Sequence, residues 1–457
     1  MTVNALVLGN GRSGRAAAEL LRREGARVVV LDGDDAWPGG EWDLCVTSPG
    51  IPLGHPWQVA ARAAGVKVVS ELQLGASRWK GRSLAVTGSK GKSSVVKLIA
   101  DTLNLAGVPA VPCGNYGTPL CEVVNCGVPP PRMAAVPVSS RQDGDGCLTG
   151  KARFQRAGDG AVWAVVEVSS FQMETTDDFH PDAAAILNLQ EDHLDRHGSV
   201  EAYHALKRKL LAGARAAFVY GLKEFKVDKV LNAPNAPNDP NDLKHLNDLK
   251  HVNDPDDLKH LNDLALMRGS YFDNEVLRTN GLIAIALMRV VGLDDAQIAA
   301  GFRAFEPLPH RMQRVAEIGG VRYVDDSKAT SLAALAAGVA MCGGPVRLIA
   351  GGLAKGDNPK TVIPRLRSTV KKVYLIGRCA DQFLSAWREA VPCEACETLD
   401  RAVAAARRDA VAGETVLLSP GAASFDQFES YGVRGDAFAT FVCAEARRGE
   451  TGTTKQG

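Results

Sequence analysis

The chain has 457 residues, enough for two to four domains with cores of their own. Its 46% apolar and 23% charged residues are typical of ordinary soluble globular proteins, and its formal net charge of +1 gives no reason to expect nucleic acid or a membrane surface as a partner. No apolar run approaches the roughly 18 residues of a membrane span, and we expect no leader segment. Ten scattered cysteines, with a lone CxxC pair at Cys393 and Cys396, suit a reducing compartment better than a disulfide or metal framework. We therefore expect a cytoplasmic protein.

Residues 1–81 form the first predicted unit, a small α/β domain. A strand at 5–8 runs into Gly-Asn-Gly-Arg-Ser-Gly at 9–14, followed by a helix and by a strand at 28–31 that ends at Asp32. A glycine turn of this type with an acidic residue about 20 positions further on usually marks dinucleotide binding. Because the same turn binds any nucleoside diphosphate, a nicotinamide oxidoreductase is only an alternative, and no hydride-transfer site follows it in the sequence.

Residues 86–94, Val-Thr-Gly-Ser-Lys-Gly-Lys-Ser-Ser, are the most informative stretch of the chain. An apolar strand leads in and apolar residues at helical spacing follow, so the glycine turn lies at a helix N-terminus, where N–H groups and the helix dipole attract phosphate. Only two residues separate Gly88 from Gly91, whereas the usual phosphate loop has four at this place. The residues expected to bind a nucleoside triphosphate here are Gly88, Ser89, Lys90, Gly91, Lys92, Ser93 and Ser94, with Ser93 also in reach of a metal ion.

Residues 82–304 and 305–457 form the second and third predicted units. Both alternate apolar strand segments with turns and helices, which predicts an α/β fold with parallel sheets, doubly wound in the third unit. Two segments of the second unit look inserted, 127–160, rich in proline and glycine, and 232–264, which repeats Asn-Asp-Leu-Lys-His-Leu with variations. We interpret the repeats as a solvated insertion, disordered or in short helices, rather than as a metal-binding tract.

Polar residues that could serve an ATP-using site follow several predicted strands. Glu167 ends a strand near the phosphate loop, where its carboxylate would suit Mg²⁺. His193 follows the next strand, and its alternative is a structural histidine. Lys207, on a predicted helix, would by itself be interpreted as a solvent-facing lysine. Arg311 and Lys328 lie in turns of the third unit and could neutralise a transferring phosphoryl group or form surface ion pairs.

Taken together, these segments resemble the Mur ligases of peptidoglycan synthesis over nearly the whole chain apart from the two insertions. The short phosphate loop fits the Gly-x-x-Gly-Lys-Ser/Thr pattern of that family. The segments of this chain that carry the resemblance most specifically are residues 167–176, 191–196, 326–330 and 418–428. The Ser-Ser-Phe-Gln and Ser-Phe-Asp-Gln-Phe sequences are similar to the glutamate-adding branch of the family.

The resemblance implies three α/β domains, namely a Rossmann-like UDP-binding domain, a central P-loop ATPase domain and a Rossmann-like C-terminal domain. It also implies a monomeric ATP-dependent ligase that adds D-glutamate to UDP-N-acetylmuramoyl-L-alanine through an acyl phosphate, with two Mg²⁺ ions and a carbamylated Lys207. The alternatives are the same ligation with L-glutamate, another Mur or folylpolyglutamate-type ligase, and a non-catalytic nucleotide sensor. The sequence leaves the chirality of the amino acid open.

Family roles carry over to named residues of this chain. Lys92, His193, Lys207 and Lys328 are the expected catalytic residues, and Ser93, Glu167, His193 and Lys207 the expected metal ligands. Asn280, Arg311 and Asp326 would contact ATP. The expected substrate contacts are Arg12, Ser13, Asp32, Asn115 and Ser169 for the nucleotide-linked substrate, and Thr330, Lys355, Ser424, Phe425 and Tyr431, together with Lys328, for glutamate. The chain departs from the family pattern at Lys90, where an asparagine is usual, and at Leu353, where an acidic residue is usual.

Overall fold

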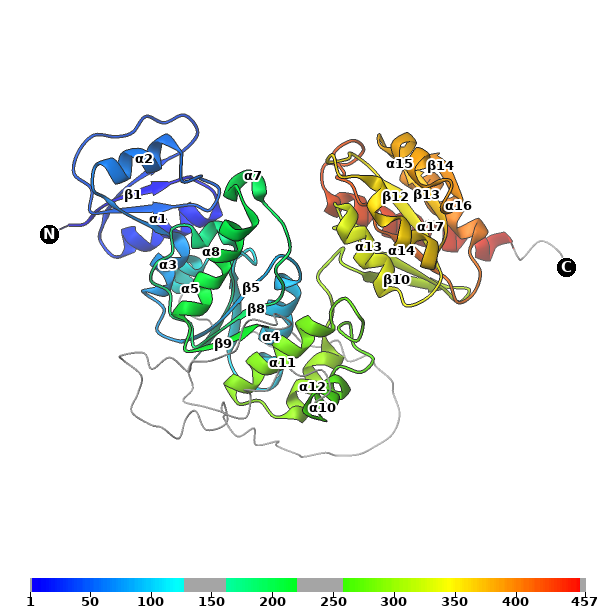
Figure 1. Ribbon diagram of the computed structural model, residues 1–457, viewed down its shortest axis with the longest axis horizontal. Coiled ribbons are helices and arrows are strands. Elements are labelled where there is room, and N and C mark those ends of the chain that lie inside the picture. Colours follow the sequence, from blue (N-terminus) through cyan, green and yellow to red (C-terminus); the bar gives the residue numbers. More distant parts are fainter. Residues whose placement is uncertain (1, 127–161, 220–257, 453–457) are drawn as a thin grey trace. The chain divides into compact units, whose positions relative to one another are not determined.

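The computed structural model describes residues 2–126, 162–219 and 258–452. The predicted insertion at 127–160 therefore lies outside the described residues, as does the insertion at 232–264 up to residue 257. Contacts divide the chain into two compact units, Met1–Asp273 with Leu277–Phe305, and Asn274–Val276 with Glu306–Gly457. The first unit holds a four-stranded and a five-stranded sheet, and the second holds a six-stranded sheet (Figure 1).

The N-terminal sheet is parallel, with strand order β2-β1-β3-β4. Alternate residues of β1 face opposite sides, so that Ala5 and Val7 pack with α1 while Leu6 and Leu8 pack with α2. Gly9 after β1 has φ 89°, and a Cβ on Gly14 would lie 1.8 Å from the Gly9 carbonyl oxygen, so α1 approaches the turn closely only because Gly14 lacks a side chain. The elements are β1 (Asn4–Leu8), α1 (Arg12–Arg23), β2 (Arg27–Leu31), β3 (Leu44–Thr47), α2 (Pro56–Ala63), β4 (Lys67–Ser70) and α3 (Glu71–Ala76).

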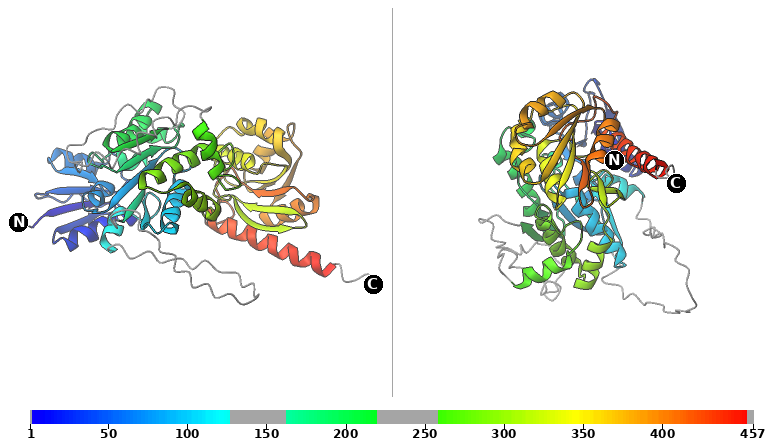
Figure 2. Two further views of the ribbon diagram at one scale, coloured as in Figure 1. Left: turned by 90° about the horizontal axis from the view of Figure 1, so that it is seen from below. Right: turned by 90° about the vertical axis from the view of Figure 1, so that its right-hand side faces the viewer.

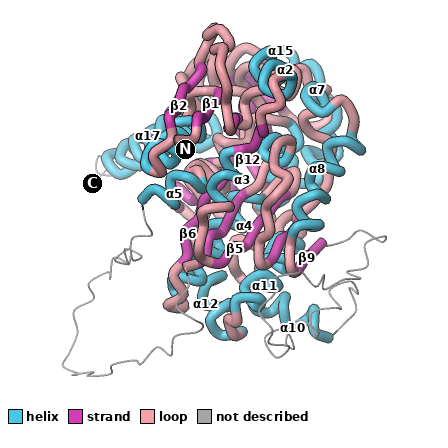
Figure 3. The backbone as a smooth tube through the Cα atoms, turned by 90° about the vertical axis from the view of Figure 1, so that its left-hand side faces the viewer, coloured by secondary structure: helices cyan, strands magenta, loops and turns pink. Residues whose placement is uncertain are grey.

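The central sheet is also parallel, with order β6-β7-β5-β8-β9, so the carboxyl end of β5 lies between those of β7 and β8. Figure 3 shows β5 in the middle of the sheet, between β6 and β9. Its strands are β5 (Arg82–Thr87), β6 (Ala110–Gly114), β7 (Trp163–Glu167), β8 (Ala183–Ile186) and β9 (Ala216–Val219). Helices α4 and α11 pack together, and α10 and α12 join them in one group. The helices are α4 (Lys92–Leu105), α5 (Leu120–Cys126), α6 (Ser170–Met173), α7 (Leu194–His197), α8 (Val200–Gly213), α10 (Leu258–Leu266), α11 (Arg278–Val291) and α12 (Asp295–Ala304).

The C-terminal sheet has the order β10-β11-β15-β12-β13-β14, and only its edge strand β10 is antiparallel to its neighbour. Helices cover both faces: α13, α14 and α15 pack in one apolar cluster, α16 and α17 in the other (Figure 2). The strands are β10 (Gln313–Ile318), β11 (Val321–Asp325), β12 (Val346–Gly351), β13 (Val370–Ile376), β14 (Cys393–Glu397) and β15 (Thr415–Leu418). The helices are α13 (Leu332–Met341), η1 (Pro359–Val362), α14 (Ile363–Thr369), α15 (Ala380–Trp387), α16 (Leu399–Asp409) and α17 (Tyr431–Gly452).

The predicted α/β class with parallel sheets is confirmed. Within the described parts of the chain, no helix is both long and apolar enough to cross a membrane. The nine cysteines in those parts are free thiols, and burial raises the pKa of several of them, including Cys45 to about 12.

Candidate active site

The glycine loop lies where the sequence predicts it, between the end of β5 at Thr87 and the start of α4 at Lys92. Gly91 is the N-cap of this 14-residue helix and has a left-handed φ of 85°. A Cβ on Gly91 would lie 2.1 Å from Asn280 Nδ2, so the buried amide of α11 packs directly on the loop. Glycine is therefore required at position 91 both by its backbone conformation and by the lack of space for a side chain. The loop and Asn280, two predicted ATP contacts that are far apart in the sequence, lie side by side.

A segment that follows β8 holds the loop in shape. Asn188 accepts a hydrogen bond from the Lys90 backbone N–H at 2.8 Å and donates one to the Lys90 carbonyl oxygen at 2.9 Å. The Ser89 hydroxyl donates to the carbonyl of Gln190 and accepts from its N–H, each at 2.9 Å. Bonds between side chains and main-chain groups thus fix the loop conformation, while the Lys90 ammonium points outward to Asp192 at 3.3 Å.

Two lysines converge on the loop from different helices. Lys92 Nζ donates to the Gly88 carbonyl at 2.8 Å, and Lys207 Nζ donates to the same oxygen at 3.1 Å. Lys207 is 1% exposed, so the interpretation of it as a solvent-facing lysine is wrong. Burial, reinforced by the charge of Lys92, lowers the pKa of Lys207 to about 7. A substantial fraction of Lys207 is therefore a neutral amine near neutral pH.

Glu167 ends β7 opposite Val86 of β5, which brings its carboxylate to the same sheet edge as the loop. Its Oε1 accepts a hydrogen bond from Asn115 Nδ2 at 2.9 Å, and the Asn115 backbone N–H donates to the Glu167 carbonyl. Its Oε2 is buried without a hydrogen-bond partner among the described residues. A buried, unpartnered carboxylate oxygen is costly unless a cation binds it, so this atom fits a magnesium ligand.

His193 is the N-cap of the one-turn helix α7 and has a left-handed φ of 52°. Its ring lies 4.7 Å from the ring of Phe171, with Nε2 3.9 Å from Asp192 Oδ1, and its side chain is 47% exposed. The ring forms no hydrogen bond within the described residues, which argues against a satisfied structural histidine. Those residues also contain no group of three His, Cys, Asp or Glu side chains placed to hold a metal, so the metal set that includes Ser93 and a modified Lys207 stays a prediction.

The predicted substrate contacts of the first unit lie on helices and loops that adjoin its two sheets. Arg12, at the start of α1, forms a bidentate ion pair with Glu122 of α5, with both bonds at 3.0 Å. This pairing lowers the pKa of Glu122. Ser13 is half-buried beside Arg12, and Asp32 is exposed after β2. Ser169 caps α6 in a reciprocal pair of bonds with Gln172.

In the second unit, Asp326 follows β11 and is buried. It accepts hydrogen bonds from the Ser419 hydroxyl at 2.9 Å and from the Met312 N–H at 3.3 Å. Burial raises the pKa of Asp326 to about 7, and the half-buried Arg311 opposes that rise by its charge. Asp326 and Arg311, two predicted ATP contacts, are therefore close enough for their charges to interact.

The predicted glutamate contacts gather at the carboxyl ends of β11, β12 and β15. Lys328 Nζ lies 3.8 Å from the ring centre of Tyr431, and Lys355 Nζ donates to the Thr330 hydroxyl at 3.2 Å. Ser424 is buried, whereas the Phe425 side chain is 72% exposed and free to meet a ligand. A cationic rim with hydroxyls and aromatic rings suits an anionic amino acid.

Sequence reasoning missed the residue that connects these segments, Arg434 of α17. It is 1% exposed, and its Nε donates to the Ser327 hydroxyl at 2.9 Å. Its Nη2 donates to the carbonyls of Ser327 at 2.9 Å and Ala422 at 3.2 Å. Burial lowers the pKa of Arg434 to about 10. The only sequence signal is its place three residues after Tyr431.

Comparison with family models is consistent with this geometry. Residues 86–234 match the Mur ligase middle domain, and residues 310–421 match the Mur ligase glutamate ligase domain. Among solved structures, MurC from Thermotoga maritima has a TM-score of 0.52 at 14% identity and covers 97% of this chain and 100% of its own. MurF from the same organism, in complex with ADP, has a TM-score of 0.52 at 14% identity, with 98% of this chain and 96% of its own covered. The chain therefore has the fold of the Mur ligases.

Curated relatives make the assignment more specific. UDP-N-acetylmuramoylalanine–D-glutamate ligase from Frankia casuarinae is 36% identical, with 96% of this chain and 93% of the relative covered. The enzymes of the same name from Acidobacterium capsulatum and Gloeobacter violaceus are each 33% identical, with 96% of this chain covered and 96% and 99% of the relatives. The chain belongs to the Mur ligase family, in the branch of the UDP-N-acetylmuramoylalanine–D-glutamate ligases.

Proposed function

We propose that this chain adds D-glutamate to UDP-N-acetylmuramoyl-L-alanine with cleavage of ATP to ADP and phosphate. Relatives of that name align over 96% of its length. The structural observation that carries the proposal is the sharing of the Gly88 carbonyl by Lys92 and the buried Lys207, beside the unpartnered oxygen of Glu167. A carboxylate that holds Mg²⁺ is common to phosphate-loop sites, but a nucleotide-binding loop alone does not need the second lysine.

The chemistry follows from the electrophile. A carboxylate resists attack by an amine because its leaving group would be oxide. The substrate carboxylate therefore first attacks the γ-phosphorus of ATP, the bond to the bridging oxygen breaks, ADP leaves and an acyl phosphate forms. The loop N–H groups at the start of α4 bind the phosphates, and Lys92 exchanges its bonds to its own loop for the charge of the γ-phosphate. The glutamate amine then attacks the acyl carbon, and phosphate leaves.

The first unit offers donors that fit magnesium. Glu167 contributes a buried carboxylate oxygen, Ser93 a hydroxyl and His193 an exposed ring nitrogen. Addition of CO₂ to the neutral amine of Lys207 would give a carbamate, which relieves the repulsion between two ammonium groups at one carbonyl and supplies oxygen ligands. Two Mg²⁺ ions bound by this set would supply charge neutralisation of the phosphoryl oxygens.

We assign the domains as 1–81 for the UDP-linked substrate, 82–304 for ATP and 305–457 for glutamate. The assignment is supported by one sheet within each range, parallel throughout except for the edge strand β10 of the third. Arg12, Ser13, Asp32, Asn115 and Ser169 are the proposed contacts of the nucleotide-linked substrate. Lys328, Thr330, Lys355, Ser424, Phe425 and Tyr431 are the proposed contacts of glutamate, and the protein would act as a cytoplasmic monomer.

The test is release of phosphate from ATP in the presence of UDP-N-acetylmuramoyl-L-alanine, with D-glutamate and L-glutamate supplied in separate reactions. Release with D-glutamate only, together with formation of the amide product, is the expected result. Release with L-glutamate only would change the assigned stereochemistry. No phosphate release with either isomer, in a protein that binds ATP, would overturn the proposal in favour of another acceptor or of a nucleotide sensor.

A further inference from the structure

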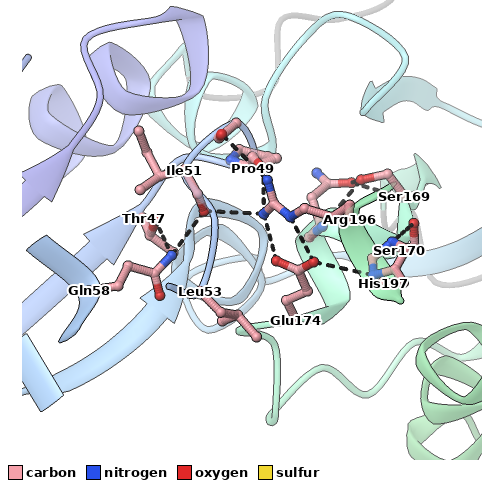
Figure 4. A network of polar contacts seen from close by, with 12 residues as sticks. Thr47, Pro49, Ile51, Leu53, Gln58, Ser169, Ser170, Glu174, Arg196 and His197 are labelled. Atoms are coloured by element: carbon pink, nitrogen blue, oxygen red, sulfur yellow. Dashed lines mark hydrogen bonds and ion pairs between the residues drawn. The ribbon is translucent and has the colours of Figure 1, made fainter. Parts of the chain in front are cut away.

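A polar network that none of the predicted roles uses lies beside the candidate metal ligands. Arg196 of α7 forms a bidentate pair with Glu174, from Nε to Oε1 at 3.0 Å and from Nη2 to Oε2 at 2.6 Å. Glu174 follows α6, so the pair joins two short elements at the carboxyl edge of the central sheet. Figure 4 shows both side chains pointing toward each other.

The guanidinium also reaches the N-terminal sheet. Its Nη2 donates to the backbone carbonyls of Pro49 and Ile51, each at 3.2 Å, and its Nη1 lies 3.5 Å from the carbonyl of Gly50 (Figure 4). These carbonyls belong to the turn after β3. The guanidinium of Arg196 on α7, a helix of the central domain, therefore contacts three successive carbonyls of a turn in the N-terminal domain.

This turn, residues 48–51, contacts the glycine turn where the UDP moiety is proposed to bind. The Ser48 hydroxyl donates to the Gly9 carbonyl at 3.4 Å, and the Ser48 N–H donates to Leu8 at 3.0 Å. On its other side, Gln58 Nε2 donates to the Ile51 carbonyl at 3.0 Å. A displacement of the 48–51 turn would thus reach the Gly9 turn directly.

The network is shielded from water. The side chains of Arg196 and Glu174 are 14% and 6% exposed. The Phe171 ring lies 4.8 Å from Arg196 Cζ, and His197 Nε2 lies 3.0 Å from the Ser170 hydroxyl. Bidentate charge-assisted bonds in such surroundings are strong and fix geometry. Arg196 also lies three residues after His193, the N-cap of the same one-turn helix.

We propose that Arg196 is a positioning residue that locks the 48–51 turn onto α7, so that the UDP-linked substrate is bound in a fixed place relative to the phosphate loop. The inference rests on the proposed function for its substrate. It assigns Arg196 no contact with that substrate. Because the phosphate loop is braced separately by Asn188 and Gln190, loss of Arg196 affects binding of the UDP-linked substrate and leaves nucleotide binding at the loop intact.

The test compares Arg196→Met and Arg196→Lys with the control Arg78→Met. Arg78 forms an equally bidentate pair with Glu24, both bonds at 3.1 Å, but at an exposed place away from the turn. The measurements on the full-length protein are kcat, KM for each substrate, ADP affinity by calorimetry, and amide hydrogen exchange of residues 48–51. We expect Arg196→Met to raise the KM for UDP-N-acetylmuramoyl-L-alanine at least about tenfold and to lower kcat as well, since misplacement by about 1 Å can cost 100-fold.

In the same variant, ADP affinity should stay within about twofold and exchange of the 48–51 amides should rise, with neither change in Arg78→Met. Arg196→Lys should restore little of the KM or of the exchange protection, because an ammonium cannot both form the bidentate pair and reach the turn. Unchanged KM and exchange in Arg196→Met would overturn the inference, as would a parallel rise of every KM. If the unmodified protein releases no phosphate, the proposed function fails, while the exchange comparison still decides whether Arg196 holds the turn.

Discussion

Lys92 and Lys207 donate to one acceptor, the carbonyl oxygen of Gly88, at 2.8 and 3.1 Å. Burial makes Lys207 costly to charge, and the repulsion between the two ammonium groups adds to this cost, so its pKa falls to about 7. Conversion of Lys207 to a carbamate would change this repulsion into attraction. The pair therefore links the geometry of the phosphate loop to the proposed modification of Lys207.

The first prediction concerns Lys207 itself. We expect Lys207→Ala to lose ligase activity at least about 100-fold, because the proposed metal ligand and a charge beside Lys92 are removed. Added formate or acetate should restore part of the activity by entering the space as a carboxylate. Lys209→Ala is the matched control, since Lys209 lies on the same helix and pairs with the exposed Asp177. Initial rates of phosphate release measure both effects, and a complete lack of rescue would argue against the carbamate.

The second prediction concerns the close approach of Gly91 and Asn280. Gly91→Ala should destabilise the first unit by about 1–2 kcal/mol through its left-handed φ of 85°, and further through the 2.1 Å contact with Asn280 Nδ2. ATP affinity should fall with it. Gly107→Ala is the control, because Gly107 also has a left-handed φ, of 80°, but no atom lies within 4 Å of its added Cβ. Urea denaturation and nucleotide titration distinguish the two, and equal losses in both variants would refute the packing argument.

The sequence predicted most of what surrounds the phosphate loop, because a strand, a glycine turn and a helix are local features. It did not predict the burial of Lys207, since the helical pattern of α8 does not show that this face packs under the loop. The edge strand β10 was also missed: Gln313–Ile318 has no buried residue, so it carries no strong apolar alternation. Arg434 was missed because arginine is rarely buried, and the sequence does not show that the start of α17 packs against Ser327 and Ala422. Contacts between distant segments decide all three cases.

The third prediction is a pH dependence of stability that arises from Glu71. This carboxyl group is buried at the start of α3, where its Oε1 accepts from the Cys121 N–H and its Oε2 has no partner within the described chain. Burial raises the pKa of Glu71 from 4.5 to about 7. Between these two pH values the folded protein holds a proton that the unfolded chain has lost. The free energy of unfolding therefore falls as pH rises through this window, by at most about 3 kcal/mol, and levels off above pH 7.

Glu71→Gln should remove this contribution to the slope, because its amide oxygen can accept the Cys121 bond without titrating. The contribution of Asp326, whose pKa burial also raises to about 7, remains. Urea denaturation at intervals from pH 5 to pH 8 measures the difference between the two proteins, and the variant should be the more stable of the two at the upper end of the range. Glu122→Gln is a suitable control, since pairing with Arg12 lowers the pKa of Glu122 and its contribution has the opposite sign. An identical slope in the unmodified protein and Glu71→Gln would contradict the assignment.

The last prediction concerns Arg434 and the proposed glutamate pocket. Its bonds to Ser327 and Ala422 fix two turns that precede Lys328 and Ser424, the proposed glutamate contacts. In Arg434→Met the acceptors of these bonds lose their partner, so both turns should relax while the apolar stem of the side chain is retained. We expect the KM for glutamate to rise about tenfold or more, with the KM for UDP-N-acetylmuramoyl-L-alanine changed less than about twofold, since the latter is proposed to bind the first unit. Arg388→Met, at the end of α15, controls for loss of an arginine from the same unit. A uniform change of both KM values would instead assign Arg434 a role in stability alone.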